Sequence, residues 1–280
     1  MLVAFDVGNS RVTLGIFDGA ELQAAFTLAT DVRRTAEEYR VLVSSLLADE
    51  GVPREQIYGA AIASVVPPLT NTFEQLCKRL FGVTPLTIGT GTRTGIRIAT
   101  HNPRELGTDR VVNAVAAHSL YEGPAIVVDF GTPTTFDVVD ASGVYLGSVI
   151  APGLGLSAEA LFQNTSRLPR VDLVRPRSVV GKDTATALQS GLLFGHAALV
   201  DGLIVRIQQE IGQRAVVVAT GEIAALIAAE TTGINRVEPY LTLIGLRLLY
   251  ELNCADRETR AENSTETRRK PRRTSADVGT

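Results

Sequence analysis

Two short stretches of the sequence place an aspartate and a glycine directly after an apolar run. Asp6 opens DVGNS after the run MLVAF, and Asp129 opens DFGT after AIVV. An aspartate at the end of a buried strand projects into a cleft mouth, and the glycine lets backbone N–H groups approach an anion. The carboxylate suits a phosphate-bound Mg²⁺. Each stretch alone also fits an ordinary hairpin with an Asx-type turn, but their repetition favours a pair of phosphate-binding turns.

A third polar group, Gly107-Thr108-Asp109-Arg110, stands at the start of a predicted helix. Asp109 is a candidate general base. Arg110 is a candidate anion clamp, because its planar guanidinium can make two parallel hydrogen bonds to a carboxylate. The alternative is that Thr108 or Asp109 is a plain helix N-cap.

Apolar periodicity predicts the elements that carry these residues. In the first half, strands are predicted at 2–5, 12–17, 22–28, 59–65 and 86–88, and helices at 35–47 and 71–81. In the second half, strands are predicted at 125–129, 135–139, 144–150 and 215–220, and helices at 157–167, 184–211 and 223–230. Further helices are predicted at 108–120 and 241–252, and a loop-rich stretch at 89–107.

Each half opens with three strands and an Asp-x-Gly turn, which predicts two similar α/β lobes with a cleft between them. We expect an N-terminal lobe at 1–118 and a C-terminal lobe at 119–253. The tail at 254–280 is charged, contains RRKPRR and lacks an apolar period, so it is predicted to be disordered. It is either a solubilising end, which is the more common case, or a contact for nucleic acid or acidic surfaces.

The composition excludes several classes of protein. The 280 residues carry a net charge of -3, which is no basic field for nucleic acid. Cys77 and Cys254 are expected to be free thiols in a reducing compartment. The N-terminus reads as a strand rather than a signal peptide, and no apolar run approaches the ~20 residues of a membrane span. A cytoplasmic, soluble protein is expected, without nucleic-acid or membrane partners.

The chain resembles the type III pantothenate kinases over residues 1–253. The resemblance rests on the joint order of many modest motifs. These are DVGNS (6–10), SVVP (64–67), NPRELGTDR (102–110), VVDFGTPTTFDVV (127–139), APGL (151–154), LPRV (168–171), VVGKDT (179–184) and LTLIGLRLLYE (241–251).

The resemblance implies duplicated ribonuclease H-like lobes of the actin-like ATPase type, each a mixed sheet flanked by helices. It implies a homodimer that uses ATP to phosphorylate pantothenate to 4'-phosphopantothenate, the first step of coenzyme A biosynthesis. It also implies a requirement for Mg²⁺ and for a monovalent cation, K⁺ or NH₄⁺.

The resemblance further assigns residues to roles. Asp109 matches the catalytic base, and Asp129 matches the ligand of the monovalent cation. Asp6 matches the Mg²⁺ side of the site. The pantothenate site matches Gly107, Thr108, Asp109 and Arg110, with Thr184 reaching in from the partner subunit. The ATP site matches Asp6, Val7, Gly8, Asn9, Ser10, Arg11, Val12, Thr13 and Thr132.

The chain departs from the family pattern at three places. Thr100 and His101 replace an aromatic and an acidic residue, which affects any substrate contact at 100. Pro133 removes a backbone donor from the second turn. Glu222 replaces a glycine near the nucleotide, where it would either repel a triphosphate or point to solvent. The alternative function is therefore a weak or silent relative that binds a ligand or assists transcription.

Overall fold

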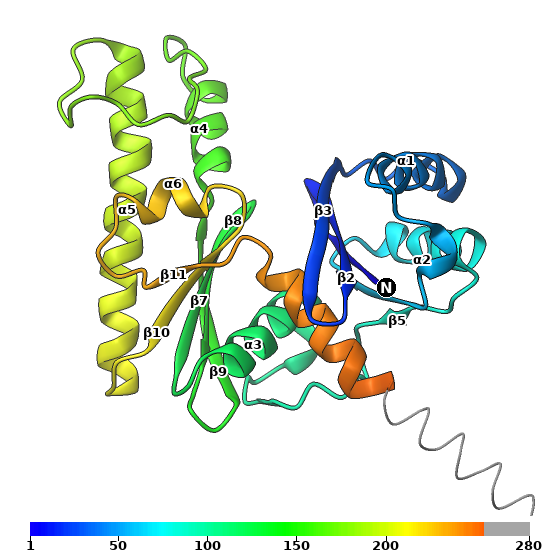
Figure 1. Ribbon diagram of the computed structural model, residues 1–280. Coiled ribbons are helices and arrows are strands. Elements are labelled where there is room, and N and C mark those ends of the chain that lie inside the picture. Colours follow the sequence, from blue (N-terminus) through cyan, green and yellow to red (C-terminus); the bar gives the residue numbers. More distant parts are fainter. Residues whose placement is uncertain (255–280) are drawn as a thin grey trace, which may run out of the picture.

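The first sheet builds the N-terminal half of the protein (Figure 1). The computed structural model describes residues 1–254, and this sheet has the strand order β3-β2-β1-β4-β5. β1 runs antiparallel to β2 and parallel to β4. The strands are β1 (Leu2–Val7), β2 (Arg11–Asp18), β3 (Glu21–Ala29), β4 (Gly59–Ser64) and β5 (Leu86–Thr87).

The second sheet repeats this arrangement in the C-terminal half. Its strand order is β11-β10-β7-β8-β9-β6, and β7 runs antiparallel to β8 and parallel to β10. β1 and β7 therefore hold equivalent positions, which confirms the predicted duplicated, actin-like α/β fold. The strands are β6 (Arg97–Ile98), β7 (Ala125–Phe130), β8 (Pro133–Val139), β9 (Val144–Pro152), β10 (Val216–Thr220) and β11 (Arg236–Val237).

Helices cover the outer face of each sheet. Alternate residues of a strand point to opposite faces, so Val3 and Phe5 of β1 pack under α1 (Ala36–Asp49) and α2 (Pro67–Phe81). In the same way Ile126 and Val128 of β7 pack under α5 (Thr184–Ile211) and α6 (Ala224–Ala228). Each half thus has its own hydrophobic core.

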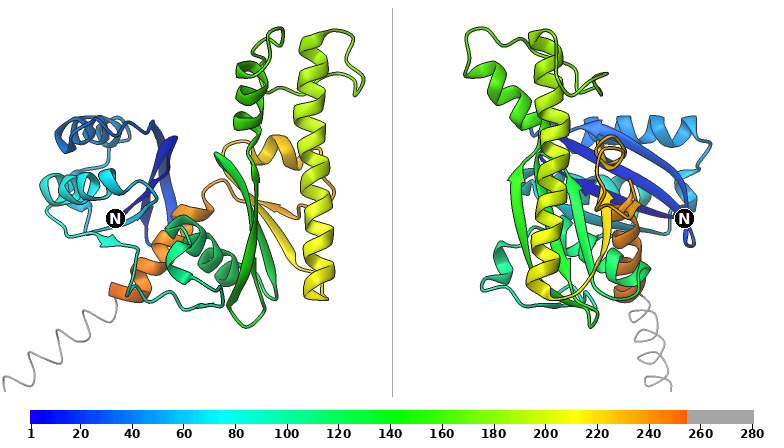
Figure 2. Two further views of the ribbon diagram at one scale, coloured as in Figure 1. Left: turned by 180° about the vertical axis from the view of Figure 1, so that it is seen from behind. Right: turned by 90° about the vertical axis from the view of Figure 1, so that its left-hand side faces the viewer.

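Two helices form a layer between the sheets (Figures 1 and 2). α3 (Thr108–Leu120) and the helix at 241–254 bury Val112, Leu243 and Leu246 against Leu2 and Ala4 of β1. On the other side Ala116 and Leu241 pack against Ala125 and Val127 of β7. The first residues of α3 are thereby fixed between the carboxyl ends of β1 and β7.

Segments cross between the two halves of the chain. β6, at residues 97–98, pairs with β9 of the second sheet, whereas the helix at 241–254 packs on the first sheet. The lobe boundary at 118/119 stays a proposal. The tail at 255–280 lies outside the described residues.

Most predicted elements agree with the structure, including both ends of α3 and α5. α2 begins at Pro67 rather than at 71, because a proline is well suited to the first turn of a helix. α4 runs over Leu154–Gln163 instead of 157–167, and β8 begins at Pro133 instead of 135. β6 and β11 were not predicted, since two residues are too few for an alternation to show.

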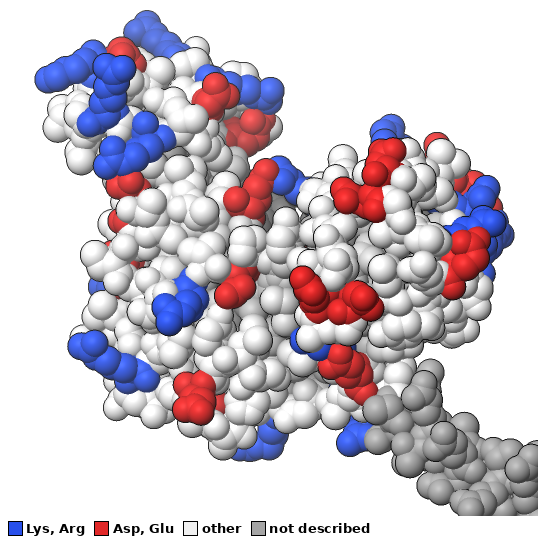
Figure 3. Space-filling model, viewed as in Figure 1, with Lys and Arg blue, Asp and Glu red and all other residues white. Residues whose placement is uncertain are grey.

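α4, the segment 164–183 and the first turns of α5 project beyond the second sheet (Figures 1 and 2). This arm (residues 155–190) exposes apolar side chains at Leu156, Leu161, Phe162, Val174, Val179 and Val180. Figure 3 shows basic side chains gathered at the end of this arm. The sequence of the arm contains Arg167, Arg170, Arg175, Arg177 and Lys182, of which Arg170 pairs with Glu159 and Arg175 with Glu230. The arm therefore presents an apolar surface with a basic end.

α5 passes a length and composition test for a membrane span, which the run of residues alone did not suggest. It is a core helix in this fold, since Leu193, Val200 and Ile204 are buried against the second sheet. It is the one helix of the described residues that passes this test.

Candidate active site

The two glycine turns face each other across a cleft. Ser10 Oγ in the β1–β2 turn and Thr132 Oγ1 in the β7–β8 turn lie 3.0 Å apart. The first turn is closed by a 2.9 Å hydrogen bond from Gly8 N–H to the Arg11 carbonyl. A cavity of about 520 Å³ lies beside both turns, and we call it the main cavity. Its lining includes Asp6, Gly8, Asn9, Ser10, Arg11, Thr13, Asp109, Asp129, Gly131, Thr132, Pro133 and Thr135.

Three carboxylates from three elements converge in the main cavity: Asp6 from β1, Asp109 from α3 and Asp129 from β7. Burial raises the pKa of Asp6 well above its usual range, and the charges of Asp109 and Asp129 add to this. Burial, with the charges of Asp109 and Asp137, raises the pKa of Asp129 to about 7. Such a cluster attracts a cation.

The backbone around Asp109 fixes its carboxylate. Thr108 Oγ1 donates to the Ser64 carbonyl at the end of β4 at 3.1 Å, and Arg110 N–H donates to Asp109 Oδ1 at 2.8 Å. A Cβ on Gly107 would lie 2.5 Å from Asp109 Oδ1. The glycine is therefore needed for the position of the carboxylate. Gly107 is also the N-cap residue, without a side-chain cap, so neither Thr108 nor Asp109 is the N-cap.

Arg110 is held by partners that the sequence did not indicate. Its Nε donates to Asp137 Oδ1 at 2.8 Å, and its Nη2 donates to Tyr145 Oη at 2.9 Å. Tyr145 in turn donates to Asp137 Oδ1 at 2.6 Å. The available signal was an acidic residue inside the apolar strand TTFDVV, where only a paired carboxylate is tolerated.

A second polar link supports Asp129. Asn113 Nδ2 donates to Asp129 Oδ2 at 3.1 Å, and Thr242 Oγ1 donates to Asn113 Oδ1 at 2.8 Å. Asn113 is fully buried in the middle of α3. A buried polar residue on an apolar helix face was the signal that sequence reasoning passed over.

An adjoining cavity of about 490 Å³ shares Asp6, Thr13 and Asp129 with the main cavity. Thr220, Ala225, Pro239 and Tyr240 extend it away from the turns. Arg11 and Glu222 line both cavities and form an ion pair, with side chains that are 48% and 59% exposed. Glu222 is therefore largely exposed to solvent, as one of the two predictions had it, and it also pairs with Arg11 at the cleft mouth.

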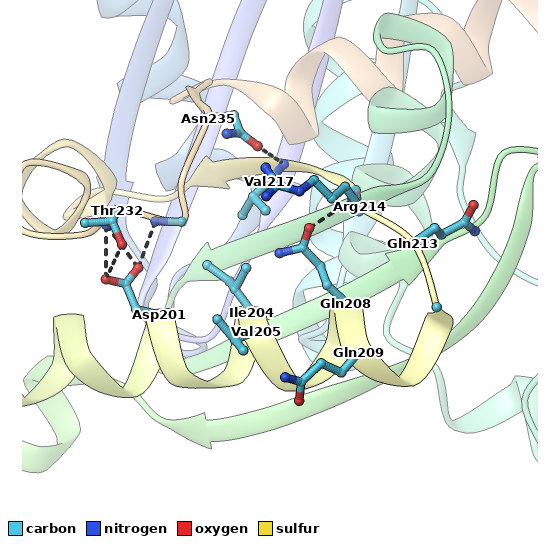
Figure 4. A pocket seen from close by; sticks show the side chains of 13 residues that line it. Asp201, Ile204, Val205, Gln208, Gln209, Gln213, Arg214, Val217, Thr232 and Asn235 are labelled. Atoms are coloured by element: carbon cyan, nitrogen blue, oxygen red, sulfur yellow. Dashed lines mark hydrogen bonds between the residues drawn. The ribbon is translucent and has the colours of Figure 1, made fainter.

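A larger cavity, of about 880 Å³, lies elsewhere, between the end of α5 and the segment around 232–235 (Figure 4). Its polar groups stabilise backbone. Asp201 accepts from the N–H groups of Thr232 and Gly233, Gln208 accepts from Ala215 N–H, and Asn235 accepts from Val217 N–H. We regard it as a structural notch, because the clustered carboxylates lie in the cleft instead.

Some predicted site residues do not line the main cavity. Val7 and Val12 have fully buried side chains in the first core, so they offer a ligand only their backbone. Thr184 is exposed at the start of α5, next to its N-cap Asp183. Gly107, Thr108 and Arg110 stand behind Asp109 and outside the lining. The Thr100 hydroxyl is buried without a hydrogen-bond partner among residues 1–254.

Within the described residues no three His, Cys, Asp or Glu side chains gather closely enough to hold a metal ion. Mg²⁺ does not require such a cage, because it retains waters and is bound through one or two carboxylates and substrate phosphates. Asp6 and Asp129 fit that mode: both line the phosphate turns, and burial raises the pKa of each, a cost that a cation would offset.

Solved structures share this fold. A putative 2-dehydro-3-deoxygalactonokinase from Sinorhizobium meliloti matches with a TM-score of 0.53 at 13% identity, over 90% of this chain and 96% of that chain. A putative Baf family transcriptional activator from Campylobacter jejuni matches with a TM-score of 0.56 at 18% identity, over 90% of this chain and 99% of that chain. Together with the paired turns, these likenesses define a two-lobed protein of the actin-like ATPase fold.

The sequence comparisons identify the family within that fold. The family model described as type III pantothenate kinase matches residues 2–206. A type III pantothenate kinase of Moorella thermoacetica is 49% identical over 253 residues, covering 90% of this chain and all of the relative (100%). One of Myxococcus xanthus is 46% identical over 255 residues, covering 91% and 100%. The chain belongs to the type III pantothenate kinase family.

Proposed function

We propose that the protein transfers the γ-phosphoryl group of ATP to the primary hydroxyl of pantothenate, giving 4'-phosphopantothenate for coenzyme A biosynthesis. The observation that carries the proposal is the convergence of Asp6, Asp109 and Asp129 in one cavity between two glycine turns. A silent ligand-binding relative would gain nothing from three buried carboxylates, whose mutual repulsion is costly without a cation.

Asp109 is the general base in this proposal. Its carboxylate lines the cavity. Arg110 N–H donates a hydrogen bond to the carboxylate, and Gly107 leaves room for it because glycine has no side chain. It accepts the hydroxyl proton while the oxygen attacks the phosphorus in line. Burial raises the pKa of Asp109, which strengthens it as a base at neutral pH.

The turns bind the phosphate chain through backbone N–H groups and hydroxyls, chiefly those of Asn9, Ser10 and Thr132. Asp6 would hold Mg²⁺ and Asp129 the monovalent cation, K⁺ or NH₄⁺. The ions supply charge neutralisation on the transferred group. Arg110 would orient the pantothenate carboxylate.

We also propose a cytoplasmic homodimer, without nucleic-acid or membrane partners. The apolar arm has exposed Val179 and Val180, which are 68% and 70% accessible, and a second copy is the partner that would cover them. Thr184 lies exposed on the same arm, outside the main cavity of its own chain, and in this proposal it contacts pantothenate from a partner subunit. Sedimentation velocity that shows a monomer at micromolar concentration would argue against this.

The test is a coupled assay of ADP release with pantothenate, ATP, Mg²⁺ and K⁺, with mass detection of the product. Asp109→Asn should lower kcat by about 10²–10⁴-fold, as expected for loss of a general base, with a melting temperature at or above that of the wild type, because the change removes a buried charge beside Asp6 and Asp129. Asp140→Asn is the matched control, because Asp140 only closes the exposed β8–β9 turn.

Absence of turnover by the wild-type protein at millimolar ATP would refute the kinase and favour the silent relative. Retention of kcat within a few-fold in Asp109→Asn would remove Asp109 from the role of base. Replacing K⁺ with Na⁺ should lower the rate, and an equal rate in both salts would contradict the role of Asp129.

A further inference from the structure

The carboxylate of Asp137 is the most enclosed charge near the cleft, and the proposed reaction does not use it. Its side chain is 0% exposed in the middle of β8. Arg110 Nε and Tyr145 Oη both donate to its Oδ1, at 2.8 and 2.6 Å. Thr135 Oγ1 donates to its Oδ2 at 3.2 Å. Burying a charge so completely is costly, and replacing such a pair with apolar residues often stabilises a protein.

This network leaves one edge of the Arg110 guanidinium available. Within residues 1–254, the hydrogen bonds of the Arg110 side chain use Nε and Nη2, and none uses Nη1. The Arg110 side chain is 13% exposed. Guanidinium is planar, so fixing Nε and Nη2 also fixes the direction of the Nη1 hydrogens.

The free edge lies beside residues that line the cleft, although Arg110 itself is outside the lining. Thr135, which donates to Asp137, lines the main cavity, and Asp109 is the next residue to Arg110 on α3. A second polar group there lacks a partner within the described chain: the buried hydroxyl of Thr100. Thr100 follows Ala99, whose N–H donates to the Tyr145 carbonyl at 3.0 Å. The Nη1 edge of Arg110 is the group that this network leaves for a ligand.

We propose that Asp137 and Tyr145 are positioning residues, which lock the Arg110 guanidinium so that its Nη1 edge meets the carboxylate of the acceptor substrate. The inference rests on the proposed function, because pantothenate supplies that carboxylate. Asp137 neutralises Arg110 and thereby keeps the arginine from folding onto Asp109, while Tyr145 braces both from the opposite strand, β9. The device selects acceptors that carry a carboxylate over those that do not.

The test compares pantothenate with pantothenol, in which an alcohol replaces the carboxylate, each as substrate and as competitor. Asp137→Asn keeps the shape and one acceptor oxygen for Tyr145 and Arg110, with the Thr135 hydroxyl turned to accept from the amide, but it removes the charge that holds Arg110. We expect kcat/KM for pantothenate to fall about tenfold or more, as for loss of a hydrogen bond to a charged group. The KM for ATP should stay within about twofold, and the preference for pantothenate over pantothenol should collapse.

Tyr145→Phe is the second variant, and it decides the matter if Asp137→Asn does not fold. It leaves the Asp137–Arg110 pair in place and removes one hydroxyl, so the KM for pantothenate should rise about threefold or more with no change for pantothenol. Asp140→Asn, on the same hairpin, is the control. It should preserve the KM for pantothenate and the preference for pantothenate over pantothenol.

The outcomes separate the inference from the proposed function. If the wild-type protein phosphorylates pantothenate and the folded variants lose activity equally on pantothenate and pantothenol, the positioning role is wrong and the kinase stands. The same holds if the variants leave KM for pantothenate unchanged. If the wild-type protein phosphorylates neither compound, the proposed function itself fails.

Discussion

At the residue scale, the position of the Asp109 carboxylate depends on the lack of a Cβ at Gly107. Gly107 has φ -57 and ψ 142, which any residue can adopt, so its backbone does not require glycine. The requirement comes from space, because a Cβ there would lie 2.5 Å from Asp109 Oδ1. The glycine of GTDR thus leaves room for the carboxylate of the proposed base, Asp109.

Gly107→Ala should therefore damage catalysis more than folding. The new methyl group displaces the Asp109 carboxylate, and a misplacement of ~1 Å can cost about 100-fold in rate. The measurement is kcat together with the melting temperature, which should change by only a few degrees. Gly89→Ala is the matched control, since a Cβ there meets nothing within 4 Å. A kcat within threefold of wild type would show that the carboxylate can adapt.

At the scale of elements, the two hairpin turns are alike in chain path but differ in what they offer a phosphate. The first turn keeps its backbone N–H groups, whereas Pro133 begins β8 and removes one donor from the second. Glu222, in the turn after β10, adds a carboxylate that pairs with Arg11 at the cleft mouth. Both features weaken the attraction of the cleft for a triphosphate.

Glu222→Gln should lower the KM for ATP. The change frees Arg11 and removes a like charge, and since both side chains are largely exposed the gain is small, about two- to fivefold. The effect should shrink between 50 mM and 500 mM salt, because exposed charges are screened. Steady-state kinetics with ATP as the varied substrate measures it, with Glu210→Gln on the exposed face of α5 as the control. A higher KM for ATP would mean that Glu222 holds the nucleotide.

At the scale of the whole molecule, the active-site layer stores an electrostatic cost. Burial and mutual repulsion raise the pKa of Asp6 and of Asp129, in the latter case to about 7. In the unfolded chain both return to ordinary values near 4. The folded state therefore binds more protons than the unfolded state between those pH values, and the stability of the ion-free protein falls as pH rises through this window.

The prediction is a lower melting temperature at pH 8 than at pH 6.5 in chelator and in K⁺-free buffer. Asp129→Asn should flatten the dependence and raise stability at pH 8, on the order of 4 kcal/mol from a shift between 3.8 and about 7. The titration of His196 has the opposite effect on stability, because burial lowers its pKa and stability then rises with pH. The scan starts at pH 6.5 to limit this contribution. Stability that rises with pH in the wild-type protein would contradict the prediction, as would an unchanged slope in Asp129→Asn.

Much of this architecture could be predicted from the sequence, because strand alternation and helix periodicity are local. The strands that carry Asp6 and Asp129, and the full length of α3, follow from apolar patterns within a few residues of each. β6 and β11 could not be predicted, because two residues form a strand only where an existing sheet edge accepts them.

The sequence by itself determined the duplicated lobes and the two glycine turns, since these depend on residue type and local spacing, and it singled out Asp109 as the candidate base. Only the tertiary structure decided which side chains share the cleft and what holds them. Asp137, Tyr145 and Asn113 join Arg110 and Asp129 across separations of 27, 35 and 16 residues. The pairing of Arg11 with Glu222 likewise joins opposite halves of the chain. Such contacts arise from how α3 packs between two sheets, and no local pattern encodes them.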